Sequence, residues 1–273
     1  RRLEGALIRA ISYSSLTGSG NTRKRWVLTA ISVVALFVIW QLAAAAVGAQ
    51  IIVPAPMAAL KALGRFLTFP SFWAAVGATL SRGFAGFLLS TAAGIVIGTA
   101  AGLNSTFRTL FRPVLSVIRT TPVMSIIIIA LIWFTTDTVP VFASFLIAFP
   151  VICGNVIQGI DSIDTDLVQM AEVFRVPRIR ILFSLVVPSV FTYFLAGAST
   201  ALGLTWKVVV AAEVLAQPIR AVGTGLYTAK VQLETPEVFA WTVVAILLSG
   251  MSEGVFHFLM RRISWSRHGE AGT

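Results

Sequence analysis

The chain is poor in charged residues. Asp, Glu, Lys and Arg make up only 12% of its 273 residues, whereas soluble domains carry roughly 25%. Apolar residues make up 57%, and the mean hydropathy is +0.88. This composition excludes an ordinary soluble domain and predicts an integral membrane protein.

Cysteine and histidine are almost absent as well. Cys153 is the only cysteine, so it can form no disulfide within the chain. The two histidines stand apart from any cluster at metal-ligand spacing, which predicts no metal site. No lysine follows a glycine, as the phosphate-binding pattern G-x-x-x-x-G-K-[ST] requires. We therefore expect no catalytic residue and no bound cofactor in this chain, which leaves transport or a membrane scaffold.

Long apolar runs account for most of the remaining sequence. Residues 26–47 carry no charge over 22 positions, and about 20 apolar residues suffice for a helix to cross the hydrocarbon core. This run is too long for the apolar part of a signal peptide, which spans about 7–15 residues, so we expect a retained helix. Further candidate spans are about 75–103, 114–134, 139–160, 190–215 and 239–260. The predicted fold is all-α, with about six transmembrane helices in one domain.

The net charge of +10 is distributed unevenly along the chain. With the N-terminus inside, fourteen basic residues lie on the inner side and four on the outer side. The inner residues are Arg1, Arg2, Arg9, Arg23, Lys24, Arg25, Arg108, Arg112, Arg175, Arg178, Arg180, Arg261, Arg262 and Arg267, and the outer residues are Lys61, Arg65, Arg220 and Lys230. The positive-inside rule then places both termini and the 161–188 segment in the cytoplasm. The basic excess is a topology signal, and we expect no binding to nucleic acid.

This topology divides the chain into three parts. Residues 1–25 form a basic cytoplasmic segment, residues 26–262 the transmembrane domain, and residues 263–273 a basic cytoplasmic tail.

Residues 161–188 form a polar, arginine-rich hairpin between two apolar runs. Asp164 or Asp166 can cap a short helix over 166–176, and Pro177 ends it. Pro188 is expected to break the helix before the next span. The helix carries an apolar stripe of Leu167, Met170, Ala171 and Phe174, and its end is ringed by Arg175, Arg178 and Arg180. Such a stripe predicts docking into a groove of a soluble partner. The alternative is a hairpin that lies on anionic membrane lipid.

Charged residues inside the spans are candidates for a translocation pathway, because each costs about 2.5–3.5 kcal/mol at the centre of a membrane helix. The candidates are Arg82, Arg119, Lys207, Glu213 and Glu253, of which Glu253 has a simpler interpretation as a residue near the inner end of the last helix. Arg82 and Arg119 have a simpler interpretation as residues near span ends, where arginine reaches the headgroups. Lys207 and Glu213 are about 240° apart around one helix, so each must pair with another helix or face water.

Small residues recur at every fourth position of the second span. They are Gly86, Ser90, Gly94, Gly98 and Gly102. This spacing leaves a groove along one face where another helix backbone can approach closely. The contact is either a fixed one within the bundle or a moving interface along a pathway.

The hairpin resembles the cytoplasmic signature loop of ABC-importer permeases, E-A-A-x3-G-x9-I-x-L-P. Gln169, Met170 and Ala171 stand at its Glu-Ala-Ala positions, Arg175 replaces its Gly, and residues 185–188 replace its Ile-x-Leu-Pro. Other segments are similar to permeases of the nitrate, sulfonate and taurine group. These are residues 53–56 (VPAP), 119–122 (RTTP), 201–215 (ALGLTWKVVVAAEVL), 223–226 (GTGL) and 235–236 (TP). Together they extend over roughly residues 26–262.

This resemblance implies a multi-pass protein of a prokaryotic plasma (inner) membrane with the type I permease arrangement. In such systems a pair of permeases joins two cytoplasmic ATPases, which bind ATP and Mg, and receives solute from an extracytoplasmic binding protein. The implied coupling residues are Gln169, Met170, Ala171, Glu172, Phe174, Arg175, Pro177 and Arg178. A second copy of this chain is the expected permease partner, with a related permease as the alternative. The departures from the signature suggest a divergent ATPase.

The solute stays open at this point. Sulfonates, nitrate, bicarbonate, pyrimidine precursors of thiamine and flavins all fit the resemblance, and the basic residues in the spans favour an anionic or strongly polar one. A carrier driven by an ion gradient is the alternative function, but such carriers usually show internal repeats, and none is visible.

Overall fold

The structure is a computed structural model that describes residues 22–266, without the side chains of residues 22–26, 172, 178 and 261–266. Most of the predicted N-terminal segment and part of the tail therefore lie outside the described residues. Contacts divide the chain between Ala58 and Ala59 into two units. In the first unit, α2 (Thr22–Val47) contains the first predicted span, and α3 (Pro56–Phe66) begins before the boundary. The indole nitrogen of Trp40 donates to the carbonyl of Pro54 at 3.0 Å and fixes the segment that follows α2.

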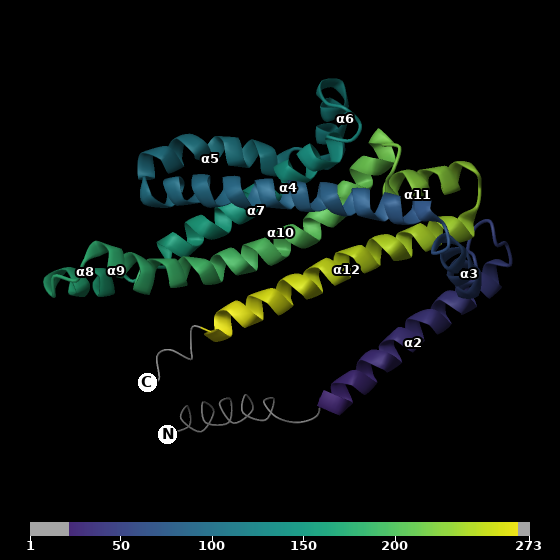
Figure 1. Cartoon of the computed structure of the whole chain (residues 1–273), viewed down its shortest axis with the longest axis horizontal. Helices are drawn as coiled ribbons and strands as arrows, with labels where there is room; N and C mark the ends of the chain where they lie inside the picture. The colour runs from purple at the N-terminus through teal and green to yellow at the C-terminus, as the bar shows by residue number, and fades with distance from the viewer. Residues whose placement is uncertain (1–21, 267–273) are drawn as a thin grey trace, which may run out of the picture. The chain divides into compact units, whose positions relative to one another are not determined.

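The second unit contains the remaining helices (Figure 1). They are α4 (Pro70–Leu103), α5 (Ser105–Thr120), α6 (Val123–Trp133), α7 (Val139–Asp161), α8 (Thr165–Val173), α9 (Arg178–Ile181), the π-helical turn η1 (Leu182–Val186), α10 (Val187–Ala216), α11 (Val222–Val231) and α12 (Thr235–Ser266). Five described helices are long and apolar enough to cross a membrane, or six if α5 and α6 form one bent span. Helix α7 packs against both α4 and α10 and forms the centre of the unit.

The predicted span over 114–134 is not a single continuous helix. The chain instead forms α5 and α6, which meet at an angle of 99°. Pro122 explains the bend, because a proline disfavours the helical conformation in the residue before it. Thr121 accordingly adopts an extended backbone with ψ of 127°.

The predicted break at Pro188 is wrong. Helix α9, the π-helical turn and α10 follow one another without a gap, and Pro188 lies in the first turn of α10. Proline lacks an N–H group and its ring crowds the carbonyl four residues back. The wider π-turn relieves this conflict, since the N–H of Val187 bonds to the carbonyl of Leu182, five residues back. The hairpin is thus joined to α10 by continuous helix.

The small-residue face of α4 lies against α7. A Cβ atom on Gly98 would stand 2.8 Å from Cβ of Val156 and 3.0 Å from the carbonyl oxygen of Cys153. Comparable overlaps would arise at Gly86, Gly94 and Gly102. The hydroxyl of Ser90 lies 3.1 Å from the carbonyl oxygen of Phe145 on α7. The two backbones therefore approach more closely than larger side chains would permit.

We expect Gly98→Ala to destabilise the protein, because its added Cβ collides with α7. The control is Gly77→Ala on the same helix, whose added Cβ meets nothing within 4 Å. Overpacking of this kind costs about 1–3 kcal/mol. Thermal unfolding in lipid nanodiscs should therefore show a lower Tm for Gly98→Ala and an unchanged or higher Tm for Gly77→Ala. Equal Tm values for the two variants would contradict the close contact.

Candidate functional site

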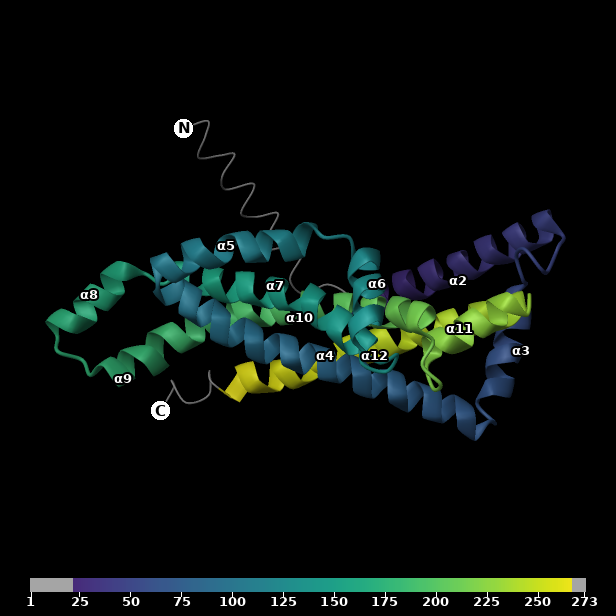
Figure 2. The same ribbon diagram turned by 90° about the horizontal axis from the view of Figure 1, so that it is seen from above.

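The hairpin that carries α8 and α9 lies at one end of the second unit, and α11 lies at the other (Figure 2). Asp164 caps α8, because its Oδ1 accepts hydrogen bonds from the N–H groups of Asp166 at 2.9 Å and Leu167 at 3.4 Å. The helix ends at Val173, three residues before the predicted end. The N–H of Val176 then bonds to the carbonyl of Ala171 at 2.9 Å, as in a Schellman motif.

Arg175 occupies the left-handed position of this motif, with φ of 54°. Glycine is the usual residue there, because a side chain disfavours the left-handed conformation by about 1–2 kcal/mol. The backbone of the hairpin therefore has the turn that a glycine would favour, although the residue is an arginine.

The side chains on α8 point largely into solvent. Phe174 is 75% exposed and Val173 is 79% exposed, and Met170, Gln169 and Pro177 are exposed too, while Ala171 is half-buried. The side chains of Glu172 and Arg178 lie outside the described residues. The predicted stripe omitted Val173, although its position three residues after Met170 places it on the same face. Four apolar groups thus converge on one uncovered surface, namely Leu167, Met170, Val173 and Phe174.

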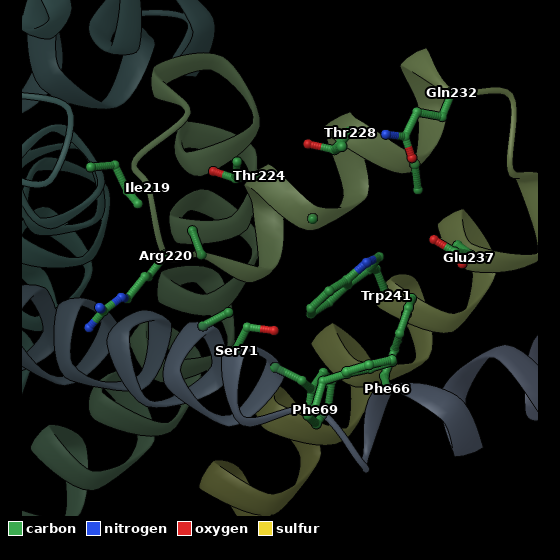
Figure 3. A pocket seen from close by; sticks show the side chains of 15 residues that line it. Phe66, Phe69, Ser71, Ile219, Arg220, Thr224, Thr228, Gln232, Glu237 and Trp241 are labelled. Atoms are coloured by element: carbon green, nitrogen blue, oxygen red, sulfur yellow. The ribbon is translucent and has the colours of Figure 1, made fainter.

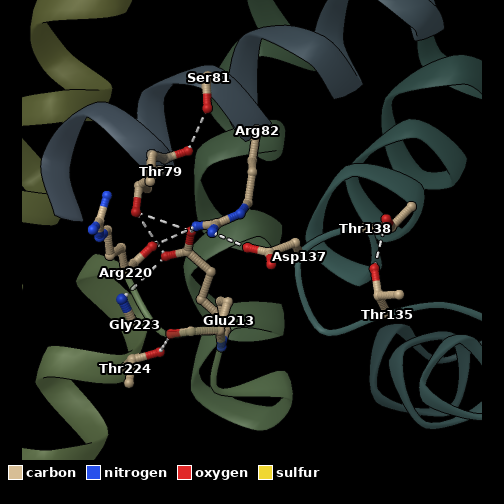
Figure 4. Close-up of polar contacts among 12 residues, drawn as sticks. Thr79, Ser81, Arg82, Thr135, Asp137, Thr138, Glu213, Arg220, Gly223 and Thr224 are labelled. Atoms are coloured by element: carbon tan, nitrogen blue, oxygen red, sulfur yellow. Dashed lines mark hydrogen bonds and ion pairs between the residues drawn. The ribbon is translucent and has the colours of Figure 1, made fainter. Parts of the chain in front are cut away.

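Two of the predicted pathway residues bind each other (Figure 4). Nη1 of Arg82 on α4 donates to Oε1 of Glu213 on α10 at 2.9 Å, and both side chains are buried. The hydroxyl of Thr79 lies 2.9 Å from both carboxylate oxygens of Glu213. This position of Glu213, away from Lys207, agrees with their separation around α10.

Backbone groups at the start of α11 and in the loop before it complete this network. The N–H of Gly223 donates to Oε2 of Glu213 at 3.1 Å, and the N–H of Val222 donates to the hydroxyl of Thr79 at 3.0 Å. Arg82 also donates to the carbonyl of Arg220 at 2.9 Å and to the carboxylate of Asp137 before α7. The network joins α4, α10, the start of α11 and the loop before α7. Paired and fully hydrogen-bonded, these charges can remain buried.

The sequence did not predict these pairings, although part of the signal was present. Thr79 lies three residues before Arg82 and therefore on the same face of α4. Asp137 had no comparable signal, because its contact depends on where the bend after α5 places the next loop.

Lys207 lines a groove of about 520 Å³ between α10 and α12. It is exposed, and in the described part of the chain it makes no hydrogen bond or ion pair. Glu253 lines the same groove and accepts a hydrogen bond from Ser249 at 3.3 Å. Trp206 also lines the groove, but its indole nitrogen is buried and has no hydrogen-bond partner among the described residues. The groove therefore combines an exposed lysine and a carboxylate.

Arg119 lines a second groove, of about 620 Å³, between α5 and α7. Its Nη2 donates to the carbonyl oxygen of Pro150 at 2.7 Å. The guanidinium lies directly over Gly154, where a Cβ atom would stand 2.4 Å from Nη2. Arg119 thus reaches toward α7 and away from the apolar side of α5.

A third cavity, of about 380 Å³, lies beside α11 at the end opposite α8 (Figure 3). Phe66 and Trp241 form an aromatic wall with ring centroids 4.8 Å apart. Arg220 and Glu237 lie at its edge. Within residues 22–266, no group of three His, Cys, Asp or Glu side chains is placed to hold a metal ion.

We expect Arg82→Met to destabilise the protein strongly, because it leaves Glu213 buried without its cation. Breaking a buried pair in this way costs about 3–5 kcal/mol. The matched change is Arg65→Met, which removes an exposed pair with Glu237 at 3.4 Å and should cost less than about 1 kcal/mol. Chemical denaturation in nanodiscs should separate the two variants clearly, and similar losses would show that the buried network adds little to stability.

Comparison with known proteins agrees with this architecture. Residues 90–265 match the family described as binding-protein-dependent transport system inner membrane component. The taurine transport system permease protein TauC of Escherichia coli is 26% identical over 202 residues, which cover 73% of this chain and 72% of the relative. The bicarbonate transport system permease protein CmpB of Synechococcus elongatus is 27% identical, over 71% of this chain and 67% of the relative.

The nitrate import permease protein NrtB of Leptolyngbya laminosa is 29% identical and covers 75% of this chain and 76% of that protein. The family match includes α7, the α8 hairpin, α10 and nearly all of α12. By this match the chain belongs to the binding-protein-dependent transport system inner membrane components, the multi-pass permeases of bacterial ABC importers.

Proposed function

We propose that this permease carries a small polar or anionic solute from an extracytoplasmic binding protein, driven by two cytoplasmic ATPase subunits that bind ATP and Mg. The relatives are named for taurine, bicarbonate and nitrate, each of which carries a small oxyanionic group. The ATP chemistry belongs to the partner subunits, and this chain supplies the membrane path.

The exposed apolar surface of α8 carries the proposal. Leu167, Met170, Val173 and Phe174 form this surface on a helix that is capped at its start and closed by a Schellman turn at its end. A short amphipathic helix of this kind fits into a hydrophobic groove of a partner. The exposed Arg175 and Arg180 lie beside it and would face acidic groups at the edge of that groove.

The arginines at the α8 end of the unit predict its orientation in the membrane. Arg108, Arg175 and Arg180 gather at the α8 end, and the positive-inside rule places this end in the cytoplasm. The opposite end, with α11 and its aromatic cavity, would then face the binding protein.

Continuous helix from Arg178 to Ala216 supplies a mechanical link between the ATPase and the membrane. Movement of α8 as two ATPases close would be carried through α9 and the π-turn into α10. A rigid-body movement of α10 against its neighbours can alternate the access to a central path. The path itself requires a second permease, and we propose a second copy of this chain, since symmetric pairs are the commonest oligomers.

Four of the charged pathway candidates have assigned roles in this proposal. Lys207 and Arg119 line grooves and have hydrogen-bonding groups that no described residue uses, so we assign them to the path. Arg82 and Glu213 are satisfied by each other and by backbone groups, so we assign them to holding the outer end together.

The docking proposal predicts that Phe174→Ala weakens binding of the purified ATPase. Loss of an exposed aromatic anchor typically costs more than 1–2 kcal/mol, which is about a tenfold or larger rise in Kd. The variant should still insert and fold, because the side chain makes few contacts within the chain. Binding of the ATPase to permease in nanodiscs measures the effect.

The matched control is Phe69→Ala, which removes an exposed phenylalanine from the opposite end. It should leave the Kd unchanged. If Phe174→Ala binds the ATPase as tightly as this control does, α8 is not the docking element and the proposed coupling fails.

A second prediction concerns Lys207. Lys207→Met keeps the length of the side chain and removes the charge, so uptake of an anionic solute should fall at least severalfold. Assembly with the ATPase and basal ATP hydrolysis should stay intact. Lys230→Met, a change of an exposed lysine at the end of α11, is the control. Normal uptake by Lys207→Met would remove this residue from the path.

A further inference from the structure

The groove between α5 and α7 contains three arginines on one face of α5. Arg108, Arg112 and Arg119 follow one another at spacings of four and seven residues, which place all three within about 40° around the helix. Their side chains line the groove together with Gln158 of α7. No aspartate or glutamate is among the lining residues, so the charge of the groove is set by the arginines.

Only one of these arginines is neutralised. Arg108 donates two hydrogen bonds to Asp161, at 2.7 and 3.0 Å, and a third to the carbonyl of Ala101 at 2.9 Å. Arg112 makes no hydrogen bond or ion pair among the described residues. Arg119 uses one nitrogen for the carbonyl of Pro150, and its other N–H groups bond to none of the residues that the structure describes. The groove therefore keeps two positive charges with free donors.

The opposite face of α5 is apolar, and the three arginines do not flank it. Leu110, Val114 and Val117 point about 180–240° away from Arg108 around the helix, and all three are exposed. An arginine that served membrane headgroups would flank this apolar face at the membrane surface. Arg112 and Arg119 instead line the groove on the side toward α7.

The free groups in the groove match one kind of ligand. An arginine presents a planar fork of N–H donors that suits the paired oxygens of a carboxylate, a sulfonate or nitrate. The amide of Gln158 makes no hydrogen bond to a described residue and can add a further donor. The volume of about 620 Å³ lies within the usual range for small-ligand sites, about 300–1,000 Å³.

We propose that Arg112 and Arg119 form a binding site for the oxyanionic group of a small solute, in the part of the path nearest the ATPases. Helix α5 begins at the end of the unit where α8 lies (Figure 1), so the site would hold an anion on its way out to the cytoplasm. Arg108 is a positioning residue, because its bonds to Asp161 and to the end of α4 fix the start of α5. The place on the path rests on the proposed function, whereas binding of the anion does not.

The test uses the full chain in nanodiscs of phosphatidylcholine, which has no net charge, with methanesulfonate as the probe. Calorimetry should show binding of methanesulfonate beyond that of chloride at the same ionic strength. Arg112→Gln and Arg119→Gln should each raise the Kd about tenfold or more, the effect of losing a charged hydrogen bond. Arg65→Gln, which removes one positive charge outside the groove, should leave the Kd unchanged.

Two results would overturn the site. One is an absence of methanesulfonate binding by the wild-type protein, and the other is equal binding by the groove variants and the Arg65→Gln control. Nanodiscs that contain phosphatidylglycerol test a lipid headgroup as the source of the anion. If this lipid abolishes probe binding and stabilises the wild type but not the groove variants, the arginines hold lipid and the proposal is wrong.

Uptake by the assembled complex separates this site from the proposed function. Phe174→Ala should lose uptake yet bind methanesulfonate normally, whereas Arg112→Gln should bind the ATPase normally and lose affinity for the anion. Suppose that Phe174→Ala loses ATPase binding but the wild-type protein binds no methanesulfonate. The proposed transport function would then be supported, and only the anion site would be wrong.

Discussion

The approach of α7 to α4 is the constraint on which the rest of the second unit depends. In lipid, helices gain little from burying apolar surface against each other, so close packing must hold them together. Glycines at positions such as 94 and 98 permit that packing, because any larger side chain would overlap α7. The position of α7 in turn fixes α5, through the bonds of Arg119 to Pro150 and of Arg108 to Asp161. The groove between α5 and α7 therefore depends on this one contact.

The two ends of the unit are built differently. At the end that carries α11, Arg82 joins Glu213, Asp137 and the carbonyl of Arg220, so four segments share one network. At the end that carries α8, this helix is held to the bundle mainly by the chain itself, and its apolar surface is exposed. A unit that is tied at one end and open at the other suits movement driven from the open end. This difference gives the π-turn at Leu182–Val186 its place in the proposed mechanism, because it lies between the hairpin and α10.

The sequence was sufficient for the features that depend on local pattern. Apolar runs located the membrane helices, Asp164 and Asp166 were the two residues predicted to cap α8, and the spacing of small residues located the face of α4 that meets α7. It was insufficient where proline has two outcomes: Pro122 bends the chain by 99°, whereas Pro188 is absorbed by a π-turn. The local sequence does not decide between these outcomes, because the neighbouring helices determine which backbone groups find hydrogen-bond partners. Local sequence does not give the partners of Arg82 either, because Asp137 and Glu213 are more than 50 residues away in the chain.

A count of charges in the spans does not give the charge that a solute would meet. Three basic residues stand in the predicted spans, yet Arg82 is balanced by Glu213 and Asp137 and adds little to the field in either groove. Lys207 shares its groove with Glu253, which offsets part of its attraction for an anion. The groove of α5 has no such carboxylate beyond Asp161, which Arg108 already binds. Of these two grooves, the groove of α5 therefore keeps the greater excess of positive charge, on Arg112 and Arg119.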